Sequence, residues 1–162
     1  MADVTIREVA PDEHTLAGDL VIDAYRTLGD DGAEFYEREL GDVAGRAKSG
    51  SVLVAEIEGQ IVGCVTFSVG QTALSEVDDP EAATIRMLGV STQARERGIG
   101  EALVRHCIDE ARRQGCVRVR LNTRTSMASA QRLYERLGFR RDPEHDWSPA
   151  PGISLLAYVR TL

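Results

Sequence analysis

The sequence predicts a single mixed α/β domain, in which a mostly antiparallel central sheet of about seven strands is flanked by about four helices. Short segments rich in β-branched residues alternate with longer segments whose apolar residues recur at helical spacing. Three predicted strands follow one another directly, which favours antiparallel pairing, whereas strand and helix alternate later in the chain. No repeat, low-complexity tract or linker interrupts the sequence, so we expect residues 1–162 to form one domain.

The first third of the chain predicts a strand followed by two helices. Residues 3–9 alternate between apolar and polar side chains, and Pro11 then opens a helical segment. Residues 29–32 (GDDG) tolerate positive φ and are expected to end that helix, and a second helix is expected over about residues 33–48. The apolar stripe of the first helix is expected to consist of Leu16, Leu20, Ala24 and Leu28, widened by Val21.

The middle of the chain predicts three strands. Residues 51–57 and 61–69 are rich in β-branched side chains, and the intervening residues 58–60 (EGQ) are typical of a hairpin. Residues 71–80 are polar and acidic without a period, so we expect an exposed loop that borders a substrate site. A strand over residues 83–90 follows this loop.

The rest of the chain alternates between helix and strand. We expect a helix over residues 98–113, a strand over 116–121, a helix over 126–137 and a final strand over 153–159. An exposed final strand could pair across a homodimer.

Composition and charge narrow the classes of partner. A net charge of -7 and a pI near 5.0 disfavour nucleic acid as a partner and suit a cationic one. The three cysteines and three histidines lack the spacing of metal ligands, so we expect no metal. The N-terminus lacks a basic region followed by an apolar run, and no segment reaches the ~18 apolar residues of a membrane span, so a cytoplasmic protein without a membrane partner is expected.

Residues 95–100 (RERGIG) carry the strongest chemical signal. Val90 ends a strand, and Gly98 and Gly100 stand where the next helix begins. Such a turn points free backbone N–H groups at an anion, and Arg95 and Arg97 add positive charge. Glycine suits these positions because a side chain would hold the ligand away from the backbone. The sequence therefore predicts a phosphate site.

Two other phosphate-binding motifs fit this segment poorly. A dinucleotide fingerprint would need a third glycine where Leu103 stands. A Walker loop would need a Gly-Lys-Ser or Gly-Lys-Thr sequence, which is missing after Gly100.

Two motifs in this part of the chain resemble those of the GCN5-related N-acetyltransferase (GNAT) family. The family's cofactor signature, Gln/Arg-x-x-Gly-x-Gly/Ala after a strand ending in Leu-Ala-Val or similar, resembles residues 87–90 (MLGV) and 95–100 (RERGIG). Residues 130–139 (AQRLYERLGF) are similar to the family's Ala-x-x-Leu-Tyr-x-x-x-Gly-Phe segment. The resemblance implies a GNAT-type fold and an enzyme that transfers an acetyl group from acetyl-CoA to a primary amine.

The resemblance also implies how acetyl-CoA binds. Backbone N–H groups of the turn would hold the pyrophosphate, and the preceding strand would pair with the pantetheine arm. The family often has Asn at the position of Met127, where the amide bonds to this arm, so Ser126 or Ser129 could substitute. The implied cofactor-binding residues are Leu88, Gly89, Val90, Arg95, Glu96, Arg97, Gly98, Ile99, Gly100, Glu101, Ser129 and Tyr134.

The resemblance assigns the proton donor to Tyr134. In the family, a tyrosine on this helix protonates the departing thiolate. A phenol with an unperturbed pKa of ~10 stays protonated at neutral pH and can donate to sulfur.

The sequence offers several candidates for the general base that would accept a proton from the amine. Some family members have a carboxylate where Thr84 or Asn122 stands here, and neither of these residues can act as a base at neutral pH. The remaining acids near the predicted site are Glu76, Asp78, Asp79 and Glu81. Glu81 is the first choice because it is nearest to the strand.

The acceptor amine is left open. Trp147 and residues 34–37 (EFYE) could line an amine pocket, and His145 lies in the loop close to where such enzymes bind the acceptor. A small-molecule amine is the preferred acceptor. A protein N-terminus, a protein lysine, or a non-catalytic role as an acyl-CoA sensor are the alternatives.

Overall fold

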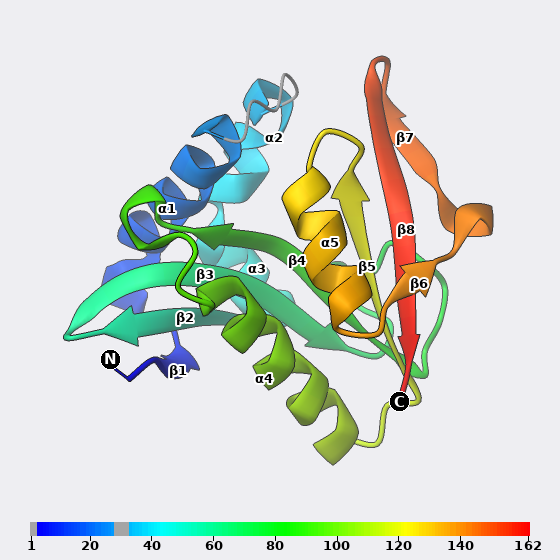
Figure 1. Cartoon of the computed structure of the whole chain (residues 1–162), viewed down its shortest axis with the longest axis horizontal. Coiled ribbons are helices and arrows are strands. Elements are labelled where there is room, and N and C mark those ends of the chain that lie inside the picture. Colours follow the sequence, from blue (N-terminus) through cyan, green and yellow to red (C-terminus); the bar gives the residue numbers. More distant parts are fainter. Residues whose placement is uncertain (1–2, 28–32) are drawn as a thin grey trace.

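The computed structural model of the protein describes residues 3–27 and 33–162, and only the backbone of residues 33–35. The predicted end of the first helix, Leu28 with residues 29–32, lies outside the described residues. The strands are β1 (Thr5–Glu8), β2 (Ser51–Ile57), β3 (Gln60–Val69), β4 (Ala82–Val90), β5 (Arg118–Arg124), β6 (Arg140–Arg141), β7 (Trp147–Ala150) and β8 (Ile153–Thr161). The α-helices are α1 (His14–Thr27), α2 (Ala33–Gly41), α3 (Val43–Ser49), α4 (Ile99–Arg113) and α5 (Ala128–Arg136) (Figure 1).

The strands of the described chain form one sheet in the order β1-β2-β3-β4-β5-β8-β6, and β7 also pairs with β8. β4 and β5 are parallel, and the other described pairs are antiparallel. Helix α4 provides the crossover that a parallel pair needs. The predicted mixed α/β fold with a mostly antiparallel sheet is therefore confirmed.

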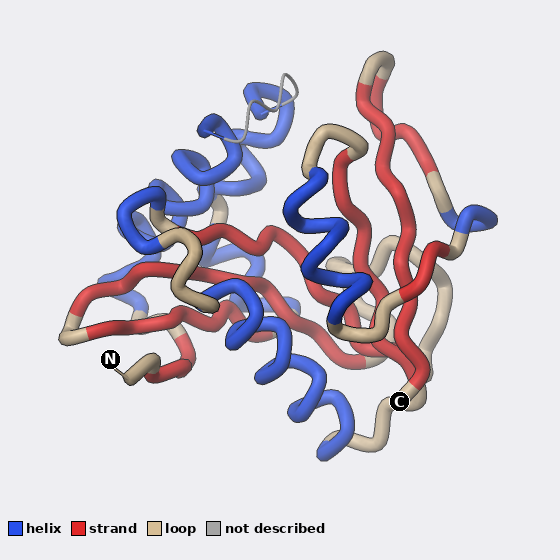
Figure 2. The backbone as a smooth tube through the Cα atoms, viewed as in Figure 1, coloured by secondary structure: helices blue, strands red, loops and turns tan. Residues whose placement is uncertain are grey.

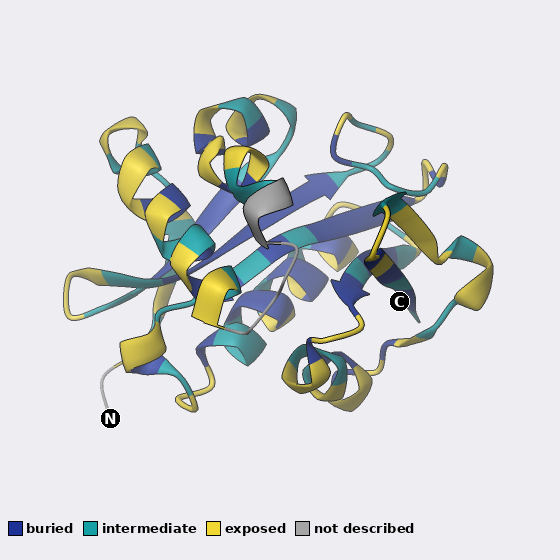
Figure 3. Cartoon of the chain, turned by 90° about the horizontal axis from the view of Figure 1, so that it is seen from above, coloured by how far each residue is buried: buried dark blue, intermediate teal, exposed yellow. Residues whose placement is uncertain are grey.

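Helices cover both faces of the sheet. On one face, α4 and α5 contribute Leu103, Ile108 and Tyr134 to a core shared with β2 to β5 and β8. On the other face, α1, α2 and α3 bury a second core that includes Val21 and Leu40. Each helix exposes its outer side, as the yellow outer surfaces in Figure 3 show.

The buried face of α1 differs from the predicted stripe. Leu16 is 56% exposed, and the helix packs instead through Ala17, Gly18, Val21 and Ala24. A Cβ atom on Gly18 would lie 3.0 Å from the backbone oxygen of Gly41, so small residues are needed where α1 crosses the end of α2.

The helix predicted over residues 33–48 is interrupted after Gly41. Asp42 adopts a non-helical conformation, and its carboxylate accepts a hydrogen bond from the Gly45 N–H at 3.0 Å. This cap starts α3 as a separate helix.

The final strand is not at an edge of the sheet. β8 pairs with β5 on one side, and with β6 and β7 on the other, which corrects the expectation of an exposed strand available to a homodimer. Residues 143–150 were not predicted to contain a strand because Pro143 and Pro149 weaken the alternation there. No helix within the described ranges has both the length and the apolar character needed to cross a membrane.

The strands β4 and β5 separate partway along the sheet, and this separation makes room for a pocket. The two strands pair only from Ala82 to Ile85, opposite residues 118–121. β4 then continues along β3 to Val90, while β5 continues along β8 to Arg124. The strands therefore diverge halfway along their length, as the backbone in Figure 2 shows.

Candidate active site

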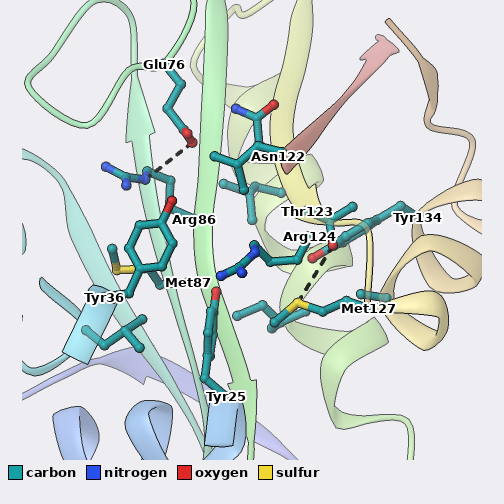
Figure 4. Close-up of a pocket in the computed structure, with 15 residues that line it drawn as sticks. Tyr25, Tyr36, Glu76, Arg86, Met87, Asn122, Thr123, Arg124, Met127 and Tyr134 are labelled. Atoms are coloured by element: carbon teal, nitrogen blue, oxygen red, sulfur yellow. Dashed lines mark hydrogen bonds and ion pairs between the residues drawn. The ribbon is translucent and has the colours of Figure 1, made fainter. Parts of the chain in front are cut away.

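A pocket of about 90 Å³ lies where β4 and β5 separate. Its walls come from residues 85–88 of β4, residues 122–124 of β5, and from α1, α2 and α5. In Figure 4, Glu76 and Arg86 lie on one side of the opening, and Asn122 and Tyr134 lie on the other. The separation of the strands thus brings charged and hydroxyl groups from distant parts of the chain into one cavity.

The edge of β4 beside the pocket has no described strand partner beyond Ile85. The register with β3 shifts near Met87, whose φ is 54°, so β4 carries a bulge at this point. Residues 88–90 continue past the bulge, and Leu88 lines the pocket. Their backbone is available for pairing with an extended ligand.

The turn between β4 and α4 has the geometry of an anion site. Gly98 caps α4 with φ 76°, and Glu96 has φ 63°. The Ala102 N–H donates to the Gly98 carbonyl at 3.0 Å, so the N–H groups of residues 99–101 precede the helical hydrogen-bond pattern. A Cβ atom on Gly98 would meet no heavy atom within 4 Å, so no described residue packs against the turn at this position. Free N–H groups at such a turn can bind an anion.

The two arginines of the turn have different surroundings. The Arg95 Nη2 donates to Thr27 Oγ1 at 2.8 Å and to the Ala24 carbonyl at 3.2 Å, so this side chain satisfies the C-terminal end of α1. Arg97 is exposed. Both arginines were predicted to bring positive charge to the turn. In the structure Arg95 is bonded to the end of α1, and Arg97 is exposed.

Glu101 connects the turn to α5. Its carboxylate accepts a hydrogen bond from the Arg136 Nη2 at 3.1 Å, and this bond holds the pKa of Glu101 below its usual value. Ser129, in the first turn of α5, is exposed and accepts a hydrogen bond from Arg132 at 3.2 Å. Met127 is buried and lines the pocket.

Tyr134 is buried on α5 and reaches from that helix toward the opening (Figure 4). Its ring lies 5.8 Å from that of Phe139 in an edge-on contact and 6.2 Å from that of Tyr158. Burial raises the pKa of the phenol. The hydroxyl is therefore protonated throughout the neutral range and can serve as a proton donor.

Glu76 comes from the loop before β4, and its side chain is only 12% exposed. Burial raises the pKa of its carboxyl, while the Arg86 charge and hydrogen bonds from Asn122 and Trp147 oppose this shift. A carboxylate with a raised pKa in a pocket is suited to accept a proton near neutral pH.

Arg86, on β4, lies between two carboxylates. Its Nε is 3.4 Å from the Glu76 Oε1, and its Nη2 is 3.9 Å from the Glu39 Oε2. Both distances exceed those of ordinary hydrogen bonds. The Arg86 guanidinium thus forms two long ion pairs, and its N–H groups can still donate short hydrogen bonds to another acceptor.

A second hollow, of about 390 Å³, adjoins the pocket and shares Tyr36, Glu76 and Arg86 with it. Its wall includes Trp147, which is 43% exposed, and Pro149 from β7. The hollow thus joins an aromatic surface to the charged groups of the pocket.

A family model described as the acetyltransferase (GNAT) family matches residues 18–139. The chain belongs to this family. The matched range contains the turn before α4, the bulged strand β4 and Tyr134.

Relatives and a solved structure agree with this assignment. This chain is 34% identical over 101 residues to N-acetylaspartate synthetase of Danio rerio, and the matched region covers 62% of this chain and 33% of that protein. It is 37% identical over 73 residues to the ribosomal protein bS18-alanine N-acetyltransferase of Escherichia coli K12, covering 45% of each. It spans less than half the length of either relative. The crystal structure of PaiA N-acetyltransferase from Thermoplasma acidophilum in complex with coenzyme A has the same fold, with a TM-score of 0.78, 12% identity and 99% coverage of both chains.

The acid that the sequence favoured as a base lies outside the pocket of this GNAT domain. Glu81 precedes β4, its side chain is 68% exposed, and it pairs with Arg118 at 3.6 Å. β4 enters the pocket only from Ile85, so nearness to the strand in sequence did not bring Glu81 to Tyr134.

Asp78 and Asp79, the other two acids of this loop, also lie outside the pocket. Asp78 is exposed. Asp79 accepts hydrogen bonds at 2.8 Å from both Arg118 and Arg120, and these hold its pKa far below the usual range. Of the four acids, the structure therefore brings only Glu76 to the pocket.

The expected acceptor residues are only partly brought together. Trp147 and Tyr36 line the hollow, whereas Glu37 pairs with Arg26 and the side chains of Glu34 and Phe35 lie outside what is described. His145 is outside the pocket lining, and its Nδ1 lies 2.7 Å from the Asp142 carboxylate. Within the described residues, no group of three or more His, Cys, Asp or Glu could hold a metal ion.

Sequence reasoning missed Arg86 as a site residue. The strand around it reads AATIRML, so a charged residue interrupts an otherwise apolar run. A charge in a buried strand needs a partner or a cavity, and this signal was available in the sequence. Tyr25 and Arg124 also line the pocket, but no pattern in the sequence singles them out.

Proposed function

We propose that this protein transfers the acetyl group of acetyl-CoA to a primary amine, with Tyr134 as the proton donor to sulfur and Glu76 as the base. The proposal depends mainly on one observation. A single pocket holds the buried, protonated phenol of Tyr134 and the largely buried carboxylate of Glu76, whose pKa is raised. Two titratable groups with opposite proton-transfer roles are what acyl transfer to an amine requires.

The backbone of the chain would bind the cofactor. In this proposal, N–H groups of residues 96–101 hold the pyrophosphate, and the free edge of residues 88–90 pairs with the pantetheine arm. The coenzyme A complex of the PaiA enzyme, which has the same fold, supports this choice of cofactor. Ser129 would contact the arm from α5, near the pocket-lining Met127.

Acetyl-CoA supplies an acetyl group activated by its bond to sulfur. As the amine nitrogen bonds to the acetyl carbon, the carbon–sulfur bond breaks. Glu76 takes a proton from nitrogen, directly or through water, and the Tyr134 hydroxyl gives one to sulfur. The products are an amide and free CoA. Proton exchange with solvent then restores both side chains.

The comparisons support acetylation of an amine without selecting the acceptor. One relative is named for a small-molecule product, and the other for an alanine of a ribosomal protein. A small molecule is favoured here because the hollow beside the pocket, about 390 Å³, is in the size range of small-ligand sites. The joint presence of Tyr134 and Glu76 argues against a non-catalytic sensor.

The proposal is tested by measuring thiol release from acetyl-CoA with a panel of amines. We expect Tyr134→Phe to lower kcat at least about tenfold while acetyl-CoA affinity changes less than about threefold, because the phenyl ring preserves packing and only the donor is lost. Tyr158→Phe is the matched control, since its hydroxyl bonds to Glu135 at 3.2 Å away from the pocket, and should stay within about twofold of wild type. Absence of thiol release with every amine, or an unchanged kcat in Tyr134→Phe, would overturn the proposal.

A further inference from the structure

The charged groups at the junction of the pocket and the hollow are of opposite sign and lie side by side. Glu76 and Arg86 are 3.4 Å apart, their side chains are 12% and 19% exposed, and both line the two cavities. A ligand entering here meets a carboxylate and a guanidinium at neighbouring positions. Such a pair is complementary to a ligand whose own positive and negative groups are adjacent.

Arg86 has the donors needed to bind an anion. Its contacts with Glu76 and Glu39, at 3.4 and 3.9 Å, are ion pairs longer than hydrogen bonds. A guanidinium carries five N–H donors in a planar fork, which matches both oxygens of a carboxylate. A ligand carboxylate can therefore bind Arg86 without first breaking a short internal bond.

Asn122 holds the Glu76 carboxylate in place. Its side-chain amide donates a hydrogen bond to Glu76, and its Oδ1 is buried without a partner among the described residues. It lines the pocket, from β5, opposite Arg86 (Figure 4). The carboxylate that would receive the amine is therefore fixed by the side chain that faces it as well as paired with Arg86.

We infer that the acceptor is a free α-amino acid with an uncharged, apolar or aromatic side chain. This inference rests on the proposed acetyl transfer and names its substrate class. The amino acid's carboxylate binds Arg86, and its amine lies beside Glu76, in the pocket that Tyr134 also lines. A single carbon separates the amine from the carboxylate group in such a molecule, which matches the adjacency of Glu76 and Arg86.

The walls of the hollow select the side chain. Tyr36, Trp147 and Pro149 offer apolar and aromatic surface beyond the charged pair. Glu39 and Glu76 would repel a second carboxylate, so acidic amino acids are disfavoured. A peptide N-terminus lacks a carboxylate next to its amine, and a polyamine would bring a further cation toward Arg86.

In the transfer, the amino nitrogen forms a bond to the acetyl carbon while the bond from that carbon to sulfur breaks. One proton leaves nitrogen for Glu76, and one passes from Tyr134 to sulfur. The product is an N-acetylamino acid, whose carboxylate remains on Arg86 until release.

The inference is tested by comparing L-phenylalanine with L-phenylalaninamide, which keeps the amine and the side chain but lacks the carboxylate. We expect kcat/KM to be about 10- to 100-fold higher for the acid, as a charge-assisted contact warrants. Arg86→Gln should reduce this ratio to near one, and Arg86→Lys should restore part of it, because lysine keeps the charge without the fork. Arg113→Gln, on the exposed end of α4, should leave the ratio unchanged.

The ratio is the informative quantity because Arg86 also lowers the pKa of Glu76, so its loss slows both substrates. Binding is followed separately through the fluorescence of Trp147, the one tryptophan in the chain. Saturable quenching by L-phenylalanine, absent with the amide and weakened by Arg86→Gln, supports the inference even if a variant turns over poorly. Equal use of acid and amide by the wild type, or preference for spermidine or a peptide N-terminus, overturns it while acetyl transfer stands. Thiol release with none of these amines contradicts acetyl transfer itself.

Discussion

The carboxylate of Glu76 lies 3.4 Å from the guanidinium of Arg86 at the point where β4 leaves β5. The loop that carries Glu76 is not a loose connection. Leu74 is buried, the Thr72 N–H donates to the Ser75 Oγ at 3.0 Å, and the Gly70 N–H donates to the Ala82 carbonyl at 3.0 Å. These contacts hold a carboxylate from an acidic loop in a buried position, where its pKa is raised.

Glu76→Gln tests the role of this carboxylate. A base works only when deprotonated, so wild-type kcat should fall as the pH drops through the raised pKa of Glu76, above the ordinary value of ~4.3. The variant should lose about 100-fold in kcat at neutral pH and should lack this acid limb. The measurement is a pH profile of thiol release. Glu39→Gln, whose side chain is 61% exposed beside the same arginine, is the control expected to keep the limb. An acid limb retained in Glu76→Gln would assign the base elsewhere.

Gly98→Trp tests the anion-site turn. Gly98 is the N-cap of α4, and a bulky side chain in this turn should hinder the approach of the pyrophosphate, so we expect acetyl-CoA affinity by calorimetry to fall at least about tenfold. Gly59→Trp is a matched control, because Gly59 also has positive φ and open surroundings but lies in the β2–β3 hairpin. Both variants should lose about 1–2 kcal/mol of stability from backbone strain. Equal affinity in the two variants would remove the turn from the binding site.

The features predicted well from sequence are local ones. The glycines at 98 and 100, the helix after them and Tyr134 each depend on patterns within a few residues, and the structure reproduces that arrangement. The hairpin is also local: Ile57 pairs with Gln60 around a two-residue turn, as residues 58–60 predicted. Such features could be read from sequence because their causes are neighbours along the chain.

The features that sequence missed depend on long-range placement. Glu81 is nearer to β4 than Glu76 in sequence, but the pocket begins only at Ile85, where β5 turns away. No local pattern records where two strands diverge. Likewise, Arg95 was predicted to face phosphate, yet its hydrogen-bond partners are the Thr27 hydroxyl and the backbone of α1. A long side chain can choose among several acceptors, and only the folded chain determines which is nearest.

Arg95→Met separates the structural contact from a phosphate contact. Loss of two hydrogen bonds to the end of α1 should lower the free energy of unfolding by about 1–2 kcal/mol, measured by urea denaturation. Arg97→Met, at an exposed position in the same turn, should change it by less than about 0.5 kcal/mol. If Arg95 acts mainly on phosphate, its variant will instead keep wild-type stability and lose acetyl-CoA affinity.

Asp79→Asn tests whether the loop is fastened by its charge cluster. Arg118 donates two hydrogen bonds to the Asp79 carboxylate, at 2.8 and 2.9 Å, and Arg120 donates a third at 2.8 Å. Arg118 first, and then Arg120, hold the pKa of Asp79 far below its ordinary value. The carboxyl is therefore charged in the folded protein at acidities where it would be protonated in the unfolded chain.

The sign of the pH dependence follows from this lowered pKa. Asp79 contributes its full stabilisation above the unfolded pKa of ~3.9, and this contribution is lost as the pH falls through the folded value. At pH 7, Asp79→Asn should unfold about 2 kcal/mol more easily than wild type. The difference should shrink between about pH 4 and pH 2, because only the wild type has the carboxyl to protonate. Urea denaturation across this range measures it, with Asp78→Asn, at an exposed position, as the control. A difference that stayed constant with pH would mean that Asp79 acts through packing rather than through its charge.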